Sequence, residues 1–224
     1  MASGHAERRR PAAFGGESAV KEENGSTVEP IRSFKTQKDW TSWLERNHRE
    51  SKGLWMRLAK KESSLRSVSY SEALEVALCY GWIDGQKRGE SDEAWLQRFL
   101  PRTAKSIWSK INREKADTLI ASRRMKPAGF TAVDAAKIDG RWDAAYDSPK
   151  AAKVSPDFQA ALDASPRARE FFAVLDGANR YAVLFRIQTV KKVETRARKI
   201  RELVQMLERE ETIHAPRKAR RSSK

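Results

Sequence analysis

The residues best suited to binding chemistry lie between positions 82 and 112. They are Trp82, Asp84, Gln86, Gln97, Arg98, Arg102, Trp108 and Asn112. Arginine presents a fork of donors to an anion, and tryptophan presents a flat face for stacking. Two short strand-like runs carry most of them. If these runs pair, Asp84 or Gln86 of the first lies close to Gln97 or Arg98 of the second. Trp82 and Trp108 could then form the walls of a pocket, with Arg102 at its mouth. The pattern predicts a site for a small anionic or planar ligand.

The same residues also fit a purely structural arrangement, which aromatic-rich sheets adopt more commonly. In that arrangement Asp84 forms the turn with Gly85, Arg98 pairs with the acid, and the tryptophans fill the core. Both interpretations stay open on the sequence alone. They differ in whether the charged groups find partners inside the protein.

A second candidate region is the basic C-terminal part of the chain. Residues 180–224 hold fourteen Lys and Arg against five Asp and Glu, a net charge of +9. The candidate polyanion-binding residues are Lys191, Lys192, Arg196, Arg198, Lys199, Arg201, Arg217, Lys218, Arg220 and Arg221. Such cation density suits phosphate contacts, whereas a solvated helix face is the plain alternative. Without a base-reading signature, any nucleic-acid binding would be non-specific and sensitive to salt.

Catalytic and metal-binding patterns are weak in this sequence. The candidate acids are Asp84, Glu90, Asp92 and Glu93. The last three lie in a polar turn, where solvated carboxylates are the ordinary outcome. Cys79 lies in an Ala/Leu-rich run and is expected to be a buried small hydrophobe. We find no phosphate loop, dinucleotide fingerprint, nucleophile elbow or His-based metal motif. The sequence therefore predicts no catalytic residue, no metal and no cofactor, and favours a non-enzymatic protein.

Composition bounds the class of protein. The chain has 224 residues, 39% of them hydrophobic and 33% charged, with a formal net charge of +15. No apolar run approaches the roughly 18 to 20 residues that span a bilayer. The N-terminus lacks the apolar segment of an export signal, and the single cysteine excludes a disulfide within the chain. We expect a cytoplasmic protein. The sequence does not identify its partner, and non-specific nucleic acid or another polyanion is the candidate that the charge suggests. The sequence does not specify an oligomeric state.

The elements that must position these residues alternate between helix and strand. Thr36 with Asp39, and Ser69 with Glu72, have the spacing of helix capping boxes. Strand patterns occupy 54–60, 82–86 and 94–100, with a turn or bulge at Asp84-Gly85. Helices are predicted to begin at Ser106, Thr131, Ser155-Pro156, Ser165-Pro166 and Thr195, with a further helix over 178–189. Lys126 to Gly129 is predicted to be a break.

These patterns predict an α+β fold, a small antiparallel sheet of about three strands with flanking helices, followed by a helical C-terminal subdomain. Residues 1–33 and the basic tail 211–224 are polar and predicted to be disordered. Between them we predict an α+β domain over 34–125 and a helical subdomain over 126–210.

Five stretches together resemble the YdeI/OmpD-associated (OmdA, bacteriocin-protection) family. They are Gly81 to Gln86, Gln97 to Arg102, Ser106 to Asn112, Met125 to Gly129 and Lys191 to Ile200. The resemblance covers roughly Phe34 to His214, although Leu100 stands where the family run carries Thr. It implies a cytoplasmic bacterial protein linked to bacteriocin or antimicrobial-peptide tolerance and to a porin, with the 126–210 subdomain of the OmpD-associated type.

The resemblance implies no cofactor or reaction. We therefore predict a stress or antimicrobial-tolerance protein that acts by binding. The alternatives are a non-specific nucleic-acid binder that uses the basic C-terminal region, and a small-molecule-binding protein or enzyme with a Trp/Asp/Arg pocket.

Overall fold

The structure, a computed structural model, describes residues 29–215. The chain divides into two compact units, the first ending at Arg102 and the second beginning at Thr103. Of the segments predicted to be disordered, 1–33 and 211–224, residues 1–28 and 216–224 lie outside the described residues. The prediction is wrong for 211–215, where the His214 N–H donates to the Asn179 side-chain oxygen (2.8 Å). No helix within residues 29–215 is long and apolar enough to cross a membrane.

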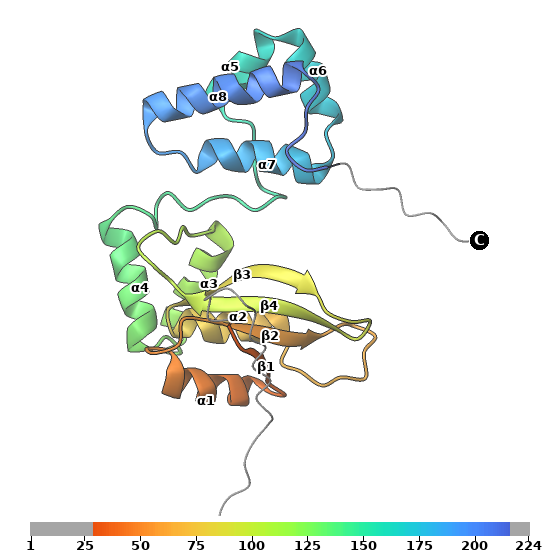
Figure 1. The fold of residues 1–224 in the computed structure, drawn as a ribbon. Coiled ribbons are helices and arrows are strands. Elements are labelled where there is room, and N and C mark those ends of the chain that lie inside the picture. Colours follow the sequence, from red (N-terminus) through yellow and green to blue (C-terminus); the bar gives the residue numbers. More distant parts are fainter. Residues whose placement is uncertain (1–28, 216–224) are drawn as a thin grey trace, which may run out of the picture. The chain divides into compact units, whose positions relative to one another are not determined.

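The first unit is a four-stranded sheet in the order β1-β2-β4-β3 with two helices (Figure 1). Strands β2 (Leu54–Ala59), β4 (Ala94–Pro101) and β3 (Trp82–Gly89) are antiparallel, as predicted, and β1 (Ile31–Ser33) pairs in parallel with β2. Strand β1 was not predicted, because residues 1–33 were expected to be disordered. That prediction is wrong for residues 31–33. A strand of three residues is too short to show an alternating pattern in the sequence. This strand forms because it pairs with β2.

Helices α1 (Gln37–Asn47) and α2 (Tyr70–Cys79) begin where the predicted capping boxes place them. At each N-terminus the hydroxyl accepts from the N3 backbone N–H, and the N3 carboxylate accepts from the cap N–H. Gly81 follows α2 with φ of 72°, a conformation that favours glycine after a helix. The two helices are joined by a hydrogen bond from the Trp40 indole N–H to the Ala73 carbonyl (3.0 Å).

The second unit contains α3 (Lys110–Ala121), α4 (Pro127–Ile138) and four later helices. Three predicted boundaries are wrong. Ser109, rather than Ser106, caps α3 by accepting from the Asn112 N–H, and the predicted break at 126–129 is the start of α4 with Pro127 at its first position. Thr131 consequently lies inside α4, where its hydroxyl donates to the Pro127 carbonyl. Proline is favoured at N1 because that N–H has no helical partner.

The last four helices are α5 (Pro156–Asp163), α6 (Pro166–Val174), α7 (Gly177–Gln188) and α8 (Val193–Glu208). Both Ser-Pro starts are confirmed, as is helix in the 178–189 segment, while α8 starts two residues before Thr195. These helices share one apolar core, made by Phe158, Leu162, Ala168, Phe172, Val183, Leu184, Ile187, Ile200, Leu203 and Leu207. The predicted α+β class with C-terminal helices is confirmed.

Candidate functional site

Trp82 is the most deeply buried member of the predicted ligand cluster, with 1% of its surface exposed. It packs edge-on against Trp40 and Trp43 of α1, at ring-centroid distances of 6.1 and 5.8 Å. Its indole N–H donates to the His48 carbonyl (3.2 Å). The ring therefore contributes to the core between β3 and α1.

Asp84 and Gln97 are engaged on either side of an irregularity in β3. The register between β3 and β4 shifts between Asp84 and Lys87, at the predicted turn or bulge. A bulge leaves ladder carbonyls without their usual partners. The buried Gln97 side-chain amide donates to the carbonyls of Gly85 (3.0 Å) and Gln86 (3.2 Å), and Asp84 accepts from the Tyr70 hydroxyl (2.7 Å). Gln97 therefore stabilises the backbone at the irregularity, and Asp84 connects β3 to the start of α2 through Tyr70.

Arg98 pairs with an acid that the sequence reading does not single out. Its guanidinium donates to both carboxylate oxygens of Glu29 (2.7 and 2.5 Å) and to the Gln86 side-chain oxygen (3.1 Å). The predicted Arg98–Asp84 pair is therefore wrong, because the partner comes from a segment 69 residues away. The bond with Glu29, stronger than the opposing effect of burial, raises the pKa of Arg98.

A similar pair lies nearby on the sheet. Arg57 on β2 donates to both carboxylate oxygens of Glu90 (2.6 and 2.5 Å), and this contact lowers the pKa of Glu90. A carboxyl with a lowered pKa is ionised at neutral pH and is poorly suited to donating a proton. Arg88 stacks over Trp55, 4.5 Å from the ring centroid. The sheet thus carries cations and aromatics whose partners lie on the sheet or beside it.

Three further predicted ligand residues have identifiable positions. The Arg102 backbone N–H donates to the Gly81 carbonyl (2.9 Å) at the end of β4. In the second unit, Trp108 is 2% exposed and packs against Trp142 at 4.9 Å, and Asn112 is the third residue of α3. A ligand-binding role for the predicted cluster stays a prediction, while the contacts give most of its members a structural role.

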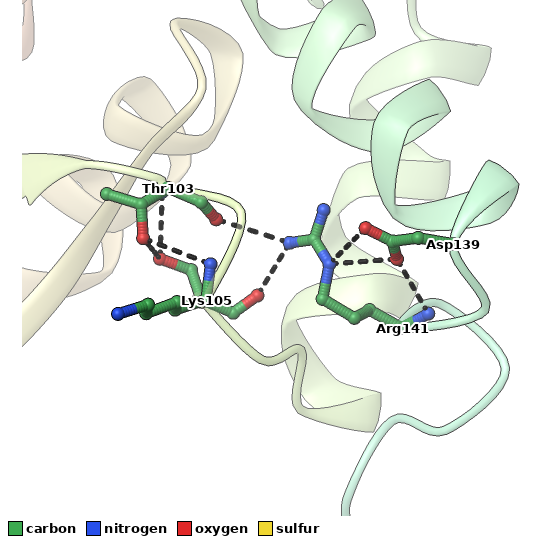
Figure 2. Close-up of polar contacts among 5 residues, drawn as sticks. Thr103, Lys105, Asp139 and Arg141 are labelled. Atoms are coloured by element: carbon green, nitrogen blue, oxygen red, sulfur yellow. Dashed lines mark hydrogen bonds and ion pairs between the residues drawn. The ribbon is translucent and has the colours of Figure 1, made fainter.

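A polar cluster around Arg141 was not predicted (Figure 2). The Arg141 Nε donates to both oxygens of Asp139 (2.8 and 2.7 Å), and one terminal nitrogen donates to the carbonyls of Ser106 (2.8 Å) and Thr103 (3.3 Å). The Ser106 hydroxyl also accepts from the Thr103 N–H (3.0 Å). Because one guanidinium group donates to two carbonyls of the segment before α3, Arg141 holds that segment against the end of α4.

Arg196 is the predicted polyanion-binding residue that has the most internal contacts. It donates to both Asp157 carboxylate oxygens (2.6 and 3.0 Å), to the Ser155 hydroxyl (2.9 Å) and to the Ile187 carbonyl (2.8 Å). It therefore ties α8 to the start of α5 and the end of α7. Its hydrogen bond, which outweighs the opposing effect of burial, holds the pKa of Asp157 well below its usual range.

The remaining cations at the junction of α7 and α8 are more available. Lys191, Lys192 and Arg201 are exposed and have no hydrogen-bond or ion-pair partner among residues 29–215. Arg198 and Lys199 share Glu202, at 3.8 and 2.5 Å. Arg186, in the last turn of α7, is also exposed and without such a partner in the described part of the chain. The predicted cations Arg217, Lys218, Arg220 and Arg221 lie outside the described residues.

We call Arg186, Lys191, Lys192, Arg198 and Arg201 the corner cluster. The sequence reading missed Arg186, and its position in the last turn of the predicted 178–189 helix is the signal that could have found it. The cluster creates a positive local potential. Lys199 lowers the pKa of Glu202 despite opposing desolvation, and the charges of Arg198 and Arg201 lower it further.

Carboxylates, histidines and the cysteine do not gather into a metal-binding arrangement in the described part of the chain, where no group of three or more was found. The two clusters thus offer different chemistry. The sheet of the first unit offers the paired guanidinium groups of Arg57 and Arg98 and packed rings, whereas the corner cluster offers exposed positive charge to an anionic partner.

The fold and the clusters describe an α+β protein whose C-terminal helices carry exposed cations. Residues 151–210, which span α5 to α8, match the model of the family described as bacteriocin-protection, YdeI or OmpD-associated. The predicted resemblance is confirmed for this segment, which is shorter than the span of Phe34 to His214 expected for it.

Residues 32–132 match a different model, a domain of unknown function (DUF8412). The four motifs between residues 81 and 129 lie within the match to the domain of unknown function. The motif at 191–200 lies within the bacteriocin-protection match. No curated protein and no solved structure matches the chain.

Proposed function

We propose that this protein is a cytoplasmic, non-enzymatic tolerance protein of the bacteriocin-protection type, and that it protects by binding a cellular partner. The observation that carries the proposal is the family match over 151–210. That segment coincides with four helices that share one apolar core. A shared core fixes the positions of the surface residues of these helices, and contacts such as the hydrogen bond from the Tyr181 hydroxyl to the Asp147 carbonyl (2.9 Å) join them to the rest of the second unit.

The distribution of charged groups supports binding over catalysis. The candidate catalytic acids of the sheet are engaged: Glu90 pairs with Arg57, and Glu93 accepts from the Ser64 hydroxyl (2.9 Å). The exposed cations lie instead on the helical segment. A surface of this kind attracts anionic partners over several ångströms and needs no reactive group.

The experiment is a survival assay in the organism that encodes the protein. Deletion of the gene is expected to lower survival during challenge with a cationic antimicrobial peptide, and expression of the full chain in trans is expected to restore it. A parallel challenge with an uncharged antibiotic serves as the control. Equal survival of the deletion strain and its parent under peptide challenge would contradict the proposal.

A further inference from the structure

We infer that the corner cluster is a binding surface for the phosphate backbone of nucleic-acid duplexes, without preference for base sequence. This inference goes beyond the proposed tolerance function and does not depend on it. It concerns the five exposed cations Arg186, Lys191, Lys192, Arg198 and Arg201 at the junction of α7 and α8 (Figure 1).

The first support is that the charge is available. Four of the five cations have no hydrogen-bond or ion-pair partner within residues 29–215, and Arg198 reaches Glu202 only at 3.8 Å. An ion pair at that distance between exposed groups holds its members weakly. Arg196, on the same helix, shows the contrasting case of a guanidinium fully committed to partners inside the protein.

The second support is the placement of the cations along α8. Ile200, Leu203 and Leu207 are buried, so the core-facing side of the helix is fixed. Arg198 and Arg201 are neighbours at three-residue spacing on the opposite side. Arg198 and Arg201 lie about 4.5 Å apart along the helix axis, close to the spacing of about 3.4 Å between successive phosphates on one DNA strand. Arg186, in the last turn of α7, and Lys191, in the connection between α7 and α8, add exposed positive charge before the start of α8.

The acidic groups on this surface do not cancel its charge. Residues 186–202 contain two acids, Glu194 and Glu202. Glu202 is already hydrogen-bonded by Lys199, a cation outside the corner cluster. Five cations against these two acids leave a net positive surface, and the neighbouring acid Asp139, on which the charge of Lys191 acts, is hydrogen-bonded by Arg141. The surface therefore favours a ligand with many closely spaced negative charges over a single carboxylate.

The same helix argues for phosphates of a nucleic acid and against a lipid surface. Binding of an amphipathic helix to a membrane requires its apolar face to enter the headgroup region. The apolar face of α8 is occupied by the shared core of α5 to α8. Val193 is the exposed large apolar residue of α8, at 76% exposure, and one valine supplies little insertion energy.

The test measures binding of the full-length protein to a short random-sequence DNA duplex between about 50 and 200 mM salt. The corner variant carries Lys191→Gln, Lys192→Gln and Arg201→Gln. The control variant carries Lys60→Gln, Lys61→Gln and Arg66→Gln, which remove the same charge from exposed residues of the first unit. Equal urea midpoints for the three proteins establish that each one is folded.

We expect the wild-type protein to bind with a steep loss of affinity as salt rises. The corner variant should show a logarithmic salt slope that is shallower by about 2 to 3, because three phosphate contacts are lost. The control variant should retain the wild-type slope to within about 1.

Three outcomes would overturn the inference. The first is an absence of duplex binding by the wild-type protein at the lowest salt. The second is an equal loss of slope in the corner and control variants. The third is a loss confined to neutralisation of Arg217, Lys218, Arg220 and Arg221, which would place the contacts in the C-terminal tail. Binding of the wild-type protein to anionic vesicles but not to the duplex falls under the first outcome and would redirect the assignment to lipid.

Discussion

The arginines of the sheet and the cations of the corner cluster carry the same type of charge, but their surroundings differ. Arg57 and Arg98 each donate twice to one carboxylate, so their charge is neutralised inside the first unit. Lys191, Lys192 and Arg201 have no ion-pair partner among residues 29–215. A high density of Lys and Arg therefore indicates a binding surface only where those side chains are not already paired with acids of the same protein.

The largest effect should come from the aromatic core of the sheet region. Trp82→Ala removes a ring that is 1% exposed and packed against two other tryptophans, and it is expected to destabilise the protein by about 3–5 kcal/mol. Urea denaturation followed by far-UV circular dichroism measures the loss. A loss below about 1 kcal/mol would show that the ring is available for a ligand and would weaken the comparison.

A smaller effect is expected from the Arg98–Glu29 pair. Both side chains are partly exposed, at 28% and 18%, so solvent screens their attraction. A double-mutant cycle with Arg98→Ala and Glu29→Ala should give a coupling free energy of about 1 kcal/mol. If the two substitutions proved additive, the pair would be a surface contact of no consequence, and Arg98 would count as an available cation.

The ability of the sequence to predict these features depends on the range of the interactions. The capping boxes at Thr36 and Ser69 were predictable because cap and partner lie three residues apart. Strand β1 was not, because it exists through pairing with β2, more than twenty residues away. The short antiparallel strands were predictable from their composition and flanking turns.

The same limit applies to the candidate sites. The partners of Arg98 and Arg196 lie 69 and 39 residues away, so the sequence could not show that these two arginines are engaged. Lys191, Lys192 and Arg201 could be named as candidates because they are close together in the sequence, around the start of α8, and their polyanion-binding role stays a prediction. Their availability depends on tertiary contacts and became visible in the structure.

The Asp157–Arg196 pair predicts a pH dependence of stability. The pKa of Asp157 is lower in the folded protein than in the unfolded chain, where its ordinary value is about 4. The pair therefore stabilises the fold fully above that value, and the contribution is lost as the pH falls below it. Urea midpoints at about pH 7 and pH 3 should differ less in Arg196→Gln than in the wild-type protein. An unchanged difference would show that the pair does not contribute.

The smallest effect on stability is expected at the corner cluster. Lys191→Gln and Lys192→Gln alter exposed side chains that have no hydrogen bond or ion pair among residues 29–215, and the charge of Lys191 acts on the exposed Asp139, so the free energy of unfolding should change by less than about 0.5 kcal/mol. A larger loss in urea denaturation would reveal an internal role for these lysines. It would also mean that these lysines, like Arg196, hold the fold together.

The most direct test of this distinction compares two arginines five residues apart on α8. Arg196→Gln and Arg201→Gln remove the same charge, and both stability and duplex affinity are measured for each full-length variant. The account predicts that Arg196→Gln lowers stability by about 1–2 kcal/mol, with little change in duplex affinity under conditions where it is folded. It predicts that Arg201→Gln leaves stability within about 0.5 kcal/mol and makes the logarithmic salt slope shallower by about 1. The reverse pattern, or identical behaviour of the two variants, would contradict the account.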